Sequence, residues 1–217
     1  EPVLADPIID SPAQITFDGN GRMFVVELRG YEQTLDGIDA IAPVGRISTH
    51  EDRNNDGTFE HHTVFVDKLL FPRFAMPFGA NAVLTMETNA DEVWKYTDAN
   101  GDGVADKKEL FTTNFGRGGH LESQQAGLFW ALDTWMYSTV NAFRIRWTPT
   151  GVLREATGPN GAQWSVTQDD DGKAWFQHGA SWSPTRTTWW PRPPRTRRLL
   201  RSSRSSRSRS SPRTWRW

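Results

Sequence analysis

The stretch AQITFDGNGRMFVVEL (Ala13 to Leu28) carries the pattern that decides the fold. Two short runs with strand-like alternation flank a D-G-N-G turn at residues 18–21, and these turn residues adopt the backbone conformations that a tight hairpin requires. Helical periodicity is scarce in the rest of the chain, where short β-rich runs dominate. The stretch therefore predicts a strand–turn–strand unit of an all-β fold.

A similar unit returns three times along the chain. The further copies are Ala80–Asp98, Ala126–Trp147 and Ala162–Gly179. Their spacing of roughly 35 to 65 residues lies in the range of propeller blades, each of which is a four-stranded antiparallel sheet. We therefore predict an all-β fold of the β-propeller class, with about four blades visible and the ring incomplete or truncated. An ordinary β-sandwich, which also has short strands and Gly-rich turns, is the alternative.

Composition divides the chain into a predicted propeller domain, residues 1–180, and a tail, residues 181–217. All 26 acidic residues precede residue 181, against 14 basic ones, whereas the tail has 11 Arg and no acidic residue. Three explanations of the tail compete: a basic interaction arm, a disordered linker, or a shifted reading frame or uncertain sequence. The abrupt change to Arg, Ser, Pro and Trp favours the last. The lack of Lys and Gly disfavours nucleic-acid binding.

The chain contains no Cys, which excludes a disulfide framework, a thiolate zinc site and a covalently attached c-type haem. It begins at Glu1 without Met or an apolar signal segment, and this start predicts a processed N-terminus. No run approaches the roughly 18 apolar residues of a membrane span. The acidic body, rich in Asn, Asp and Gly, favours a periplasmic or other extracytoplasmic location.

The segment DANGDGVADKKE, residues 98–109, has the spacing of an EF-hand calcium loop. Oxygen ligands at alternate positions can surround one Ca²⁺, and the Gly at the sixth position permits the sharp turn. The preceding run EVWKYT alternates like a strand, so we expect the loop to lie within a β-hairpin and not between two helices. The predicted calcium ligands are Asp98, Asn100, Asp102, Val104, Asp106 and Glu109.

A weaker copy of this loop, DRNNDG, places Asp52, Asn54 and Asp56 at its first, third and fifth positions. Its twelfth position is Thr63, which lacks the carboxylate of a bidentate ligand. For both loops the alternative is an Asx-rich turn that holds no ion.

Other chemical motifs are sparse among the residues. No metal-binding His pair of the HExxH kind occurs, and the neighbouring His61 and His62 would point to opposite faces of a strand. The sequence also lacks a Gly-x-Ser-x-Gly motif, a P-loop and a Gly-x-Gly-x-x-Gly motif that follows a strand. Hydrolase, NTPase and nicotinamide-dependent functions therefore lack support.

Three segments carry a family resemblance, in the order FDGNGRMFVVELRGY, KYTDANGDGVADKKELF and FGRGGHLESQQAGLFWALDTWMYSTVNAFRIRW. With them the chain resembles, over about residues 8–180, the sorbosone- or glucose-dehydrogenase-like propellers, including the membrane-bound dehydrogenase-like proteins of planctomycete-type bacteria. The resemblance implies a propeller fold, export and often a fused cytochrome c. Related soluble sugar dehydrogenases use calcium and pyrroloquinoline quinone, with a His as the base that takes up the substrate proton.

Carried onto this chain, the resemblance implies His120 as the catalytic base, with His178 as the less favoured alternative, and Arg117 as a contact to substrate or cofactor. Two departures from the family pattern bear on catalysis. The family places an acidic residue directly before a His and a Gln in this segment, and here that position is Ser123. A complete ring of this family has about six blades, whereas about four are visible.

Two functions from different classes follow from these residues. The first is a calcium-binding propeller that acts as an accessory or interaction subunit of a membrane-associated electron-transfer complex, with a protein partner such as a cytochrome c. The second is a calcium- and quinone-dependent sugar or alcohol dehydrogenase. A nucleic-acid binder is the third and least supported alternative.

Overall fold

A computed structural model describes residues 3–116, 120–158, 160, 162–178 and 181–184. These residues lie in one compact unit, Glu1–Thr187. The predicted tail lies outside the described residues from residue 185 onward, and its first four residues, Ser181–Pro184, form a strand. The described part of the chain contains no helix with the length and apolar character needed to cross a membrane.

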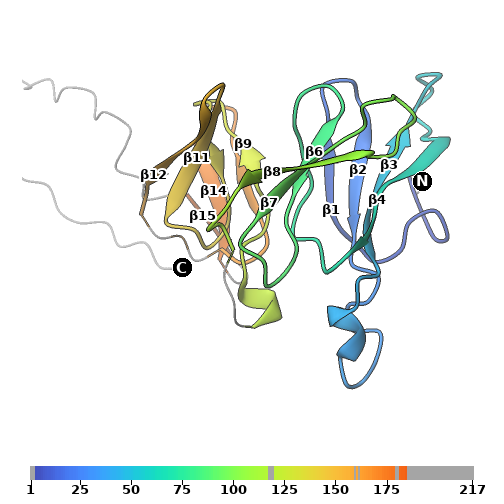
Figure 1. Ribbon diagram of the computed structural model, residues 1–217, viewed down its shortest axis with the longest axis horizontal. Coiled ribbons are helices and arrows are strands. Elements are labelled where there is room, and N and C mark those ends of the chain that lie inside the picture. Colours follow the sequence, from blue (N-terminus) through green and yellow to red (C-terminus); the bar gives the residue numbers. More distant parts are fainter. Residues whose placement is uncertain (1–2, 117–119, 159, 161, 179–180, 185–217) are drawn as a thin grey trace, which may run out of the picture. The chain divides into compact units, whose positions relative to one another are not determined.

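The strands form four antiparallel sheets that follow one another along the chain, and within each sheet the strands pair in sequence order (Figure 1). The first sheet consists of β1 (Pro12–Phe17), β2 (Met23–Glu27), β3 (Gly45–Glu51) and β4 (His61–Leu69). The second consists of β5 (Met76–Pro77), β6 (Ala82–Thr85), β7 (Val93–Thr97) and β8 (Lys107–Thr112).

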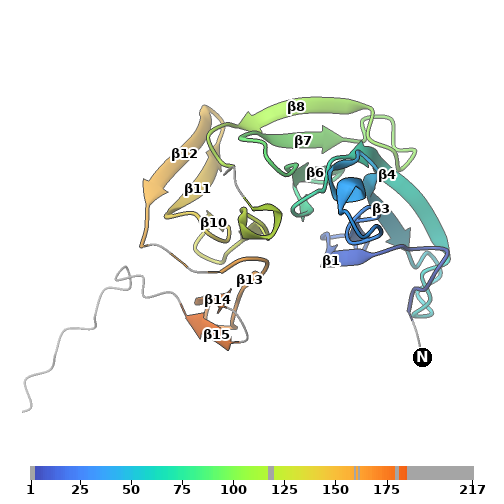
Figure 2. The ribbon, with the colours of Figure 1, turned by 90° about the horizontal axis from the view of Figure 1, so that it is seen from below.

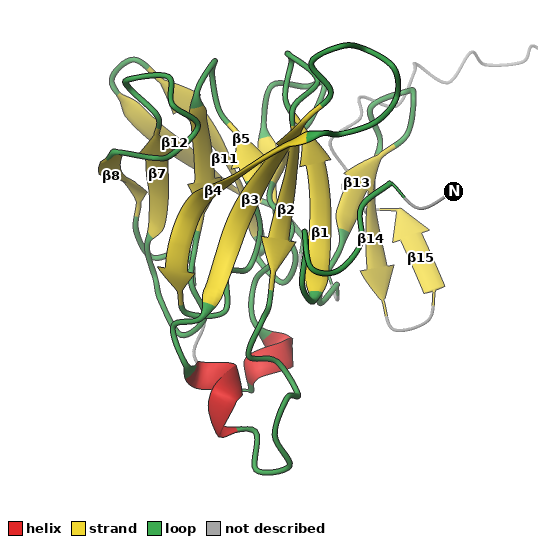
Figure 3. Cartoon of the chain, turned by 90° about the vertical axis from the view of Figure 1, so that its right-hand side faces the viewer, coloured by secondary structure: helices red, strands yellow, loops and turns green. Residues whose placement is uncertain are grey.

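The third sheet consists of β9 (Phe129–Trp130), β10 (Met136–Tyr137), β11 (Phe143–Thr148) and β12 (Gly151–Ala156). The fourth consists of β13 (Val166–Gln168), β14 (Ala174–His178) and β15 (Ser181–Pro184). Two short 3-10 helices, η1 (Ile38–Ile41) and η2 (Leu121–Ser123), lie at the same end of the sheets (Figure 3).

Each predicted repeat falls within one of these sheets. The first copy forms the β1–β2 hairpin, the second β6 and β7, the third β9 to β11, and the fourth β13 and β14. The first, third and fourth copies start at the first strand of their sheets, whereas the second starts at the second strand, β6.

Two of the hairpin turns share one hydrogen-bond pattern. The Oδ1 atom of Asp18 accepts the backbone N–H groups of the residues two and four positions later, at 2.8 and 3.0 Å. Asp169 does the same in the fourth sheet, at 3.2 and 2.9 Å. Gly21 and Gly172 follow at φ +82° and +77°, a left-handed conformation that Gly adopts without a steric cost. The aspartate therefore folds each turn, and the glycine completes it.

The strand β6 of the second sheet is buried on both of its faces. Val83 and Leu84 are neighbours on β6 and both are fully buried, and successive residues of a strand point to opposite faces. Val83 packs in a core with Phe24 and Phe65 of the first sheet, whereas Leu84 packs in a core with Ile145 of the third sheet. One short strand thus joins two hydrophobic cores.

The third and fourth sheets share a further core, in which Phe176 of β14 packs with Phe129 and Tyr137. Each sheet therefore packs on the next one in the chain, and Figure 2 shows this succession of sheets. A β-sandwich has a single core between two sheets, whereas here three cores join four sheets. The prediction of an all-β propeller fold is confirmed.

A substitution in the core between the first two sheets tests this packing. Phe65 is 1% exposed and meets the ring of Phe24 edge-on at 5.5 Å. We predict that Phe65→Ala lowers the free energy of unfolding by about 3–5 kcal/mol, because it removes a buried ring and leaves a cavity. Urea denaturation measures the change. Phe17, which is 55% exposed, gives the control, and Phe17→Ala should cost less than about 1 kcal/mol. Equal losses in both variants would contradict the assigned core.

Candidate functional site

The first predicted calcium loop connects β7 to β8, the third and fourth strands of the second sheet. The two strands pair across the loop, with Thr97 opposite Lys107. Strands flank the loop on both sides, so the prediction of a hairpin in place of a helix–loop–helix unit is confirmed.

Side-chain oxygens of the loop bind its own backbone. Asp98 is 2% exposed and accepts the N–H of Gly103 at 2.9 Å. Asn100 accepts the N–H of Asp102 through Oδ1 at 2.9 Å. The Oδ1 atom of Asp102 in turn accepts the N–H of Val104 at 2.8 Å. These bonds wind the backbone around the polar side chains, so the loop is ordered by its own predicted ligand residues.

The last two predicted ligands of the first loop differ in their placement. Asp106 accepts the N–H of Ala99 at 3.2 Å and so closes the loop. Glu109 lies on β8, where its two carboxylate oxygens pair with Lys95 at 2.8 Å and Lys107 at 2.9 Å. Hydrogen bonds from Lys95 and then Lys107 hold the pKa of Glu109 at about 2. Five of the six predicted residues therefore lie in the wound loop and its closing bond, and the sixth, Glu109, pairs with lysines.

The second predicted loop repeats three hydrogen bonds of the first at the same loop positions. Gly57 donates its N–H to Asp52 at 2.8 Å, and Asp56 donates its N–H to Asn54 at 2.9 Å. Thr58 donates its N–H to Oδ1 of Asp56 at 2.8 Å. The weaker sequence match therefore adopts the same local structure.

The two loops also occupy equivalent places in successive sheets, because each joins the third strand to the fourth at the end opposite the 3-10 helices (Figure 1). The first loop contacts the first sheet, where the Ala105 N–H donates to the Phe65 carbonyl at 2.9 Å. Gly103 has φ +88°, and a Cβ there would lie 3.2 Å from Thr63. A pocket of about 250 Å³ beside the loop has walls from both sheets.

The donor chemistry of the loops fits calcium. The described residues contain no cluster of three or more His, Cys, Asp or Glu side chains arranged for a metal ion. The loops instead combine carboxylate, amide and backbone carbonyl oxygens, and Ca²⁺ accepts such mixed oxygen ligands in a flexible geometry. On this chemistry Asp98, Asn100, Asp102 and Asp106 fit the ion, together with the carbonyl of Val104.

A second feature, which we call the inner cavity, lies between the first and fourth sheets and has a volume of about 460 Å³. Its walls come from the four sheets or from the segments that lead into them. The lining residues include Gln14, Leu28, Arg73, Gly127, Trp164 and Gln177.

Arg73 is the charged residue among those that line the inner cavity. It is 3% exposed, and its guanidinium donates to the backbone carbonyls of Gln125 at 2.9 Å, Leu121 at 3.1 Å and Gln124 at 2.9 Å. The ring of Trp164 covers the guanidinium at 4.3 Å. Burial lowers the pKa of Arg73 to about 10, so the group stays charged at neutral pH. Arg73 thereby ties the second sheet to the segment before the third.

The predicted catalytic base lies on this same segment. His120 is exposed and directly precedes η2, and Ser123 ends that helix. The next residue, Leu121, accepts the bond from Arg73, so His120 lies on a chain segment that adjoins the inner cavity. Arg117, the predicted contact to substrate or cofactor, falls outside the described residues.

No sequence pattern pointed to Arg73 or Trp164. Neither residue belongs to a motif, and they are far apart in the chain. The one signal was a single Arg inside the apolar run LLFPRFAMPF, where a charged residue that is buried needs hydrogen-bond partners.

Four successive antiparallel sheets that are joined by shared hydrophobic cores define a β-propeller. The chain belongs to the family described as "Domain of unknown function (DUF7133)", whose model matches residues 1–213. A search of curated proteins gives no match.

Solved propellers share this fold. A gluconolactonase from Xanthomonas campestris matches with a TM-score of 0.55 and 11% identity, over 79% of this chain and 55% of that chain. Regucalcin, a calcium-binding protein from Agrobacterium tumefaciens, matches with a TM-score of 0.51 and 10% identity, over 78% of this chain and 55% of that chain. The PQQ domain of a pyranose dehydrogenase from Coprinopsis cinerea, in its holo form, matches with a TM-score of 0.51 and 12% identity, over 85% of this chain and 49% of that chain. The chain spans about half the length of these proteins, and the likeness shows the fold.

Replacement of Arg73 tests its role in holding the segment beside the inner cavity. We predict that Arg73→Met lowers the free energy of unfolding by about 3 kcal/mol or more, because three backbone carbonyls lose bonds from a charged donor. Urea denaturation measures the loss. The control is Arg29→Met, whose ion pair with Asp10 is exposed, and it should cost less than about 1 kcal/mol. An Arg73→Met protein as stable as the control variant would contradict this role.

Proposed function

We propose that this chain is a calcium-binding propeller of an extracytoplasmic protein, and that it acts as an accessory or interaction subunit of a membrane-associated electron-transfer complex. The observation that carries the calcium assignment is the matched hydrogen-bond pattern of the two loops at 52–58 and 98–104. A loop that its own backbone bonds already hold in a wound form loses little conformational entropy when it binds an ion.

The inner cavity supports a role in binding more than in turnover. Its described walls are apolar or neutral apart from Arg73, whose guanidinium is already bonded to three carbonyls. A general base must lie within hydrogen-bond reach of the proton that it takes up, and His120 lies on an exposed segment beside the cavity. The proposed partner is a protein that carries electrons, such as a cytochrome c, in keeping with the family resemblance.

The second candidate is a calcium- and quinone-dependent sugar or alcohol dehydrogenase. It is favoured by the fold that the chain shares with a PQQ domain and by the three segments that resemble sorbosone- and glucose-dehydrogenase-like proteins. The positive charge of Arg73 suits pyrroloquinoline quinone, which carries carboxylates, and the bound quinone would accept the electrons of the substrate. In this function His120 would take up the substrate proton, and Arg117 would contact substrate or cofactor.

Calcium binding can be tested on single loop residues. We predict that calcium raises the melting temperature of the native chain, because an ion at about 100 times its Kd adds about 2.7 kcal/mol of stability. Asp98→Asn should weaken calcium binding strongly, whereas Glu109→Gln should bind nearly as well as the native chain, since Glu109 pairs with lysines. Thermal melts and calorimetric titrations measure both effects. Equal melting temperatures in calcium and in chelator would contradict calcium binding.

Activity separates the two candidate functions. We predict that the chain, supplied with calcium and pyrroloquinoline quinone, reduces a redox dye in the presence of sugars no faster than a protein-free control. A soluble sugar dehydrogenase assayed in parallel shows that the reagents are active. Quinone-dependent dye reduction that disappears in His120→Ala would reject the accessory role and establish the dehydrogenase.

A further inference from the structure

The connection from β2 to β3, residues 28–44, carries η1 and extends beyond the ends of the sheets (Figure 1). We call it the projecting loop. Four of its large apolar side chains are exposed, and they lie within ten successive residues: Leu35, Ile38, Ile41 and Val44. Leu35 is fully exposed. Single apolar side chains are common on protein surfaces, whereas a group of them indicates a surface that binds a partner.

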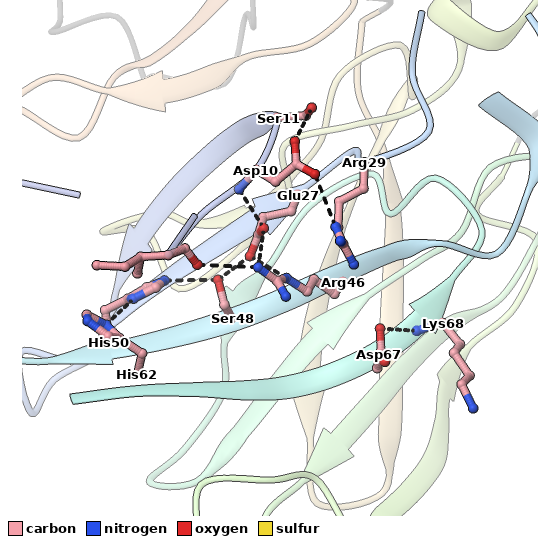
Figure 4. Close-up of polar contacts among 11 residues, drawn as sticks. Asp10, Ser11, Glu27, Arg29, Arg46, Ser48, His50, His62, Asp67 and Lys68 are labelled. Atoms are coloured by element: carbon pink, nitrogen blue, oxygen red, sulfur yellow. Dashed lines mark hydrogen bonds and ion pairs between the residues drawn. The ribbon is translucent and has the colours of Figure 1, made fainter. Parts of the chain in front are cut away.

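A buried carboxylate holds the base of the projecting loop (Figure 4). Glu27 ends β2, is fully buried and pairs at 2.8 Å with Arg46, which lies near the start of β3. The same carboxylate accepts the hydroxyl of Ser48 at 2.6 Å and the N–H of Asp10 at 2.8 Å. A buried charge with this many partners ties the two strands together where the loop leaves them.

Hydrogen bonds within the projecting loop fold it on itself. The Gly37 N–H donates to the Thr34 carbonyl at 3.1 Å, and the Ala40 N–H donates to the Gly37 carbonyl at 3.2 Å. A side chain at Gly30 would clash with the carbonyl of Asp39, so the loop returns closely onto its own base. The exposed apolar side chains therefore lie on an ordered segment, which loses little conformational entropy when a partner binds.

The charge of the projecting loop indicates the chemistry of its partner. Between Arg29 and Arg46 the chain has three acidic residues, Glu32, Asp36 and Asp39, and no Lys, Arg or His. Segments that bind lipid surfaces combine apolar side chains with Lys and Arg, because many membranes are anionic. Apolar side chains among acidic ones instead fit a protein surface whose apolar patch is surrounded by basic side chains, since opposite charges guide the two surfaces together.

We propose that the projecting loop is the docking surface for a basic protein partner, with Leu35 and Ile38 at the apolar centre of the contact. The partner presents an apolar patch that Lys and Arg side chains surround. Leu28 and Tyr31 at the base of the loop line the inner cavity, so the docking surface adjoins that cavity. This inference rests on the proposed role as an interaction subunit and names the surface through which that role is carried out.

The experiment uses a soluble c-type cytochrome with a basic surface as the probe. It is titrated at low salt into the isotopically labelled, calcium-loaded chain, and amide chemical shifts locate the contact and give the affinity. Leu35→Ser/Ile38→Ser removes two apolar groups from the loop. Leu132→Ser/Leu153→Ser is the matched control, because both of its side chains are also exposed but lie on the third sheet and its β9–β10 connection. Thermal melts confirm that each variant is folded, and vesicles of phosphatidylcholine with phosphatidylglycerol test a lipid surface.

We expect the cytochrome to shift the amides of the projecting loop and to bind the loop variant at least about tenfold more weakly, with the control variant within about twofold of the native chain. Binding should weaken as salt rises from about 10 to 200 mM. Shifts elsewhere, with unchanged affinity in the loop variant, would overturn the docking surface and leave the proposed function standing. No binding of the cytochrome by the native chain would reject both. Binding to vesicles in place of the cytochrome, lost in the loop variant, would assign the loop to a lipid surface and overturn the proposal.

Discussion

The burial of the middle sheets on both faces is the constraint on which the rest of this structure depends. Val83 and Leu84 are neighbours on β6, yet they belong to two different cores. A strand in this position must be apolar throughout, as the run AVLT of β6 nearly is, and its sheet must have another sheet on each side. The order of the sheets in space therefore follows their order in the chain.

The connections at the ends of the sheets lie outside these hydrophobic cores and carry the binding groups. At one end, the connections from third to fourth strands carry the two aspartate-rich loops, and the first of them contacts the neighbouring sheet through Ala105 and Phe65. Toward the interior, the segments that enter the sheets surround the inner cavity, where Arg73 joins three backbone carbonyls. Binding groups thus lie on short connections that the cores hold in place.

Local sequence patterns were sufficient to predict the hairpins and the wound loops, because a turn depends on residues within a few positions of one another. Asp18 and Asn100 bond to backbone groups close by in the chain. The pairing of Glu109 was not predictable from its spacing in the loop, because its register on β8 places it beside Lys95. The spacing of residues in a motif gives their distance along the chain, whereas the side chain that each residue contacts depends on the neighbouring strand.

Contacts that depend on strand register could not be predicted from the sequence. Strand alternation predicted His61 and His62 on opposite faces of a strand, in agreement with their partners Glu51 and His50. The pairing of His62 with His50 requires the register of β3 on β4 across the whole intervening loop, which no local pattern encodes. Arg73 likewise gains its partners from a segment about 50 residues later.

The most direct test is native-state hydrogen exchange. It measures whether successive sheets form one cooperative unit through their shared cores. The amides of Ile47 in the first sheet, Val83 in the second and Ile145 in the third lie in strands at these cores. If the cores couple the sheets, these amides exchange with the same free energy of opening, equal to that of global unfolding. Opening of one sheet at a free energy several kcal/mol below the others would show that the sheets are stable independently, and would contradict the account.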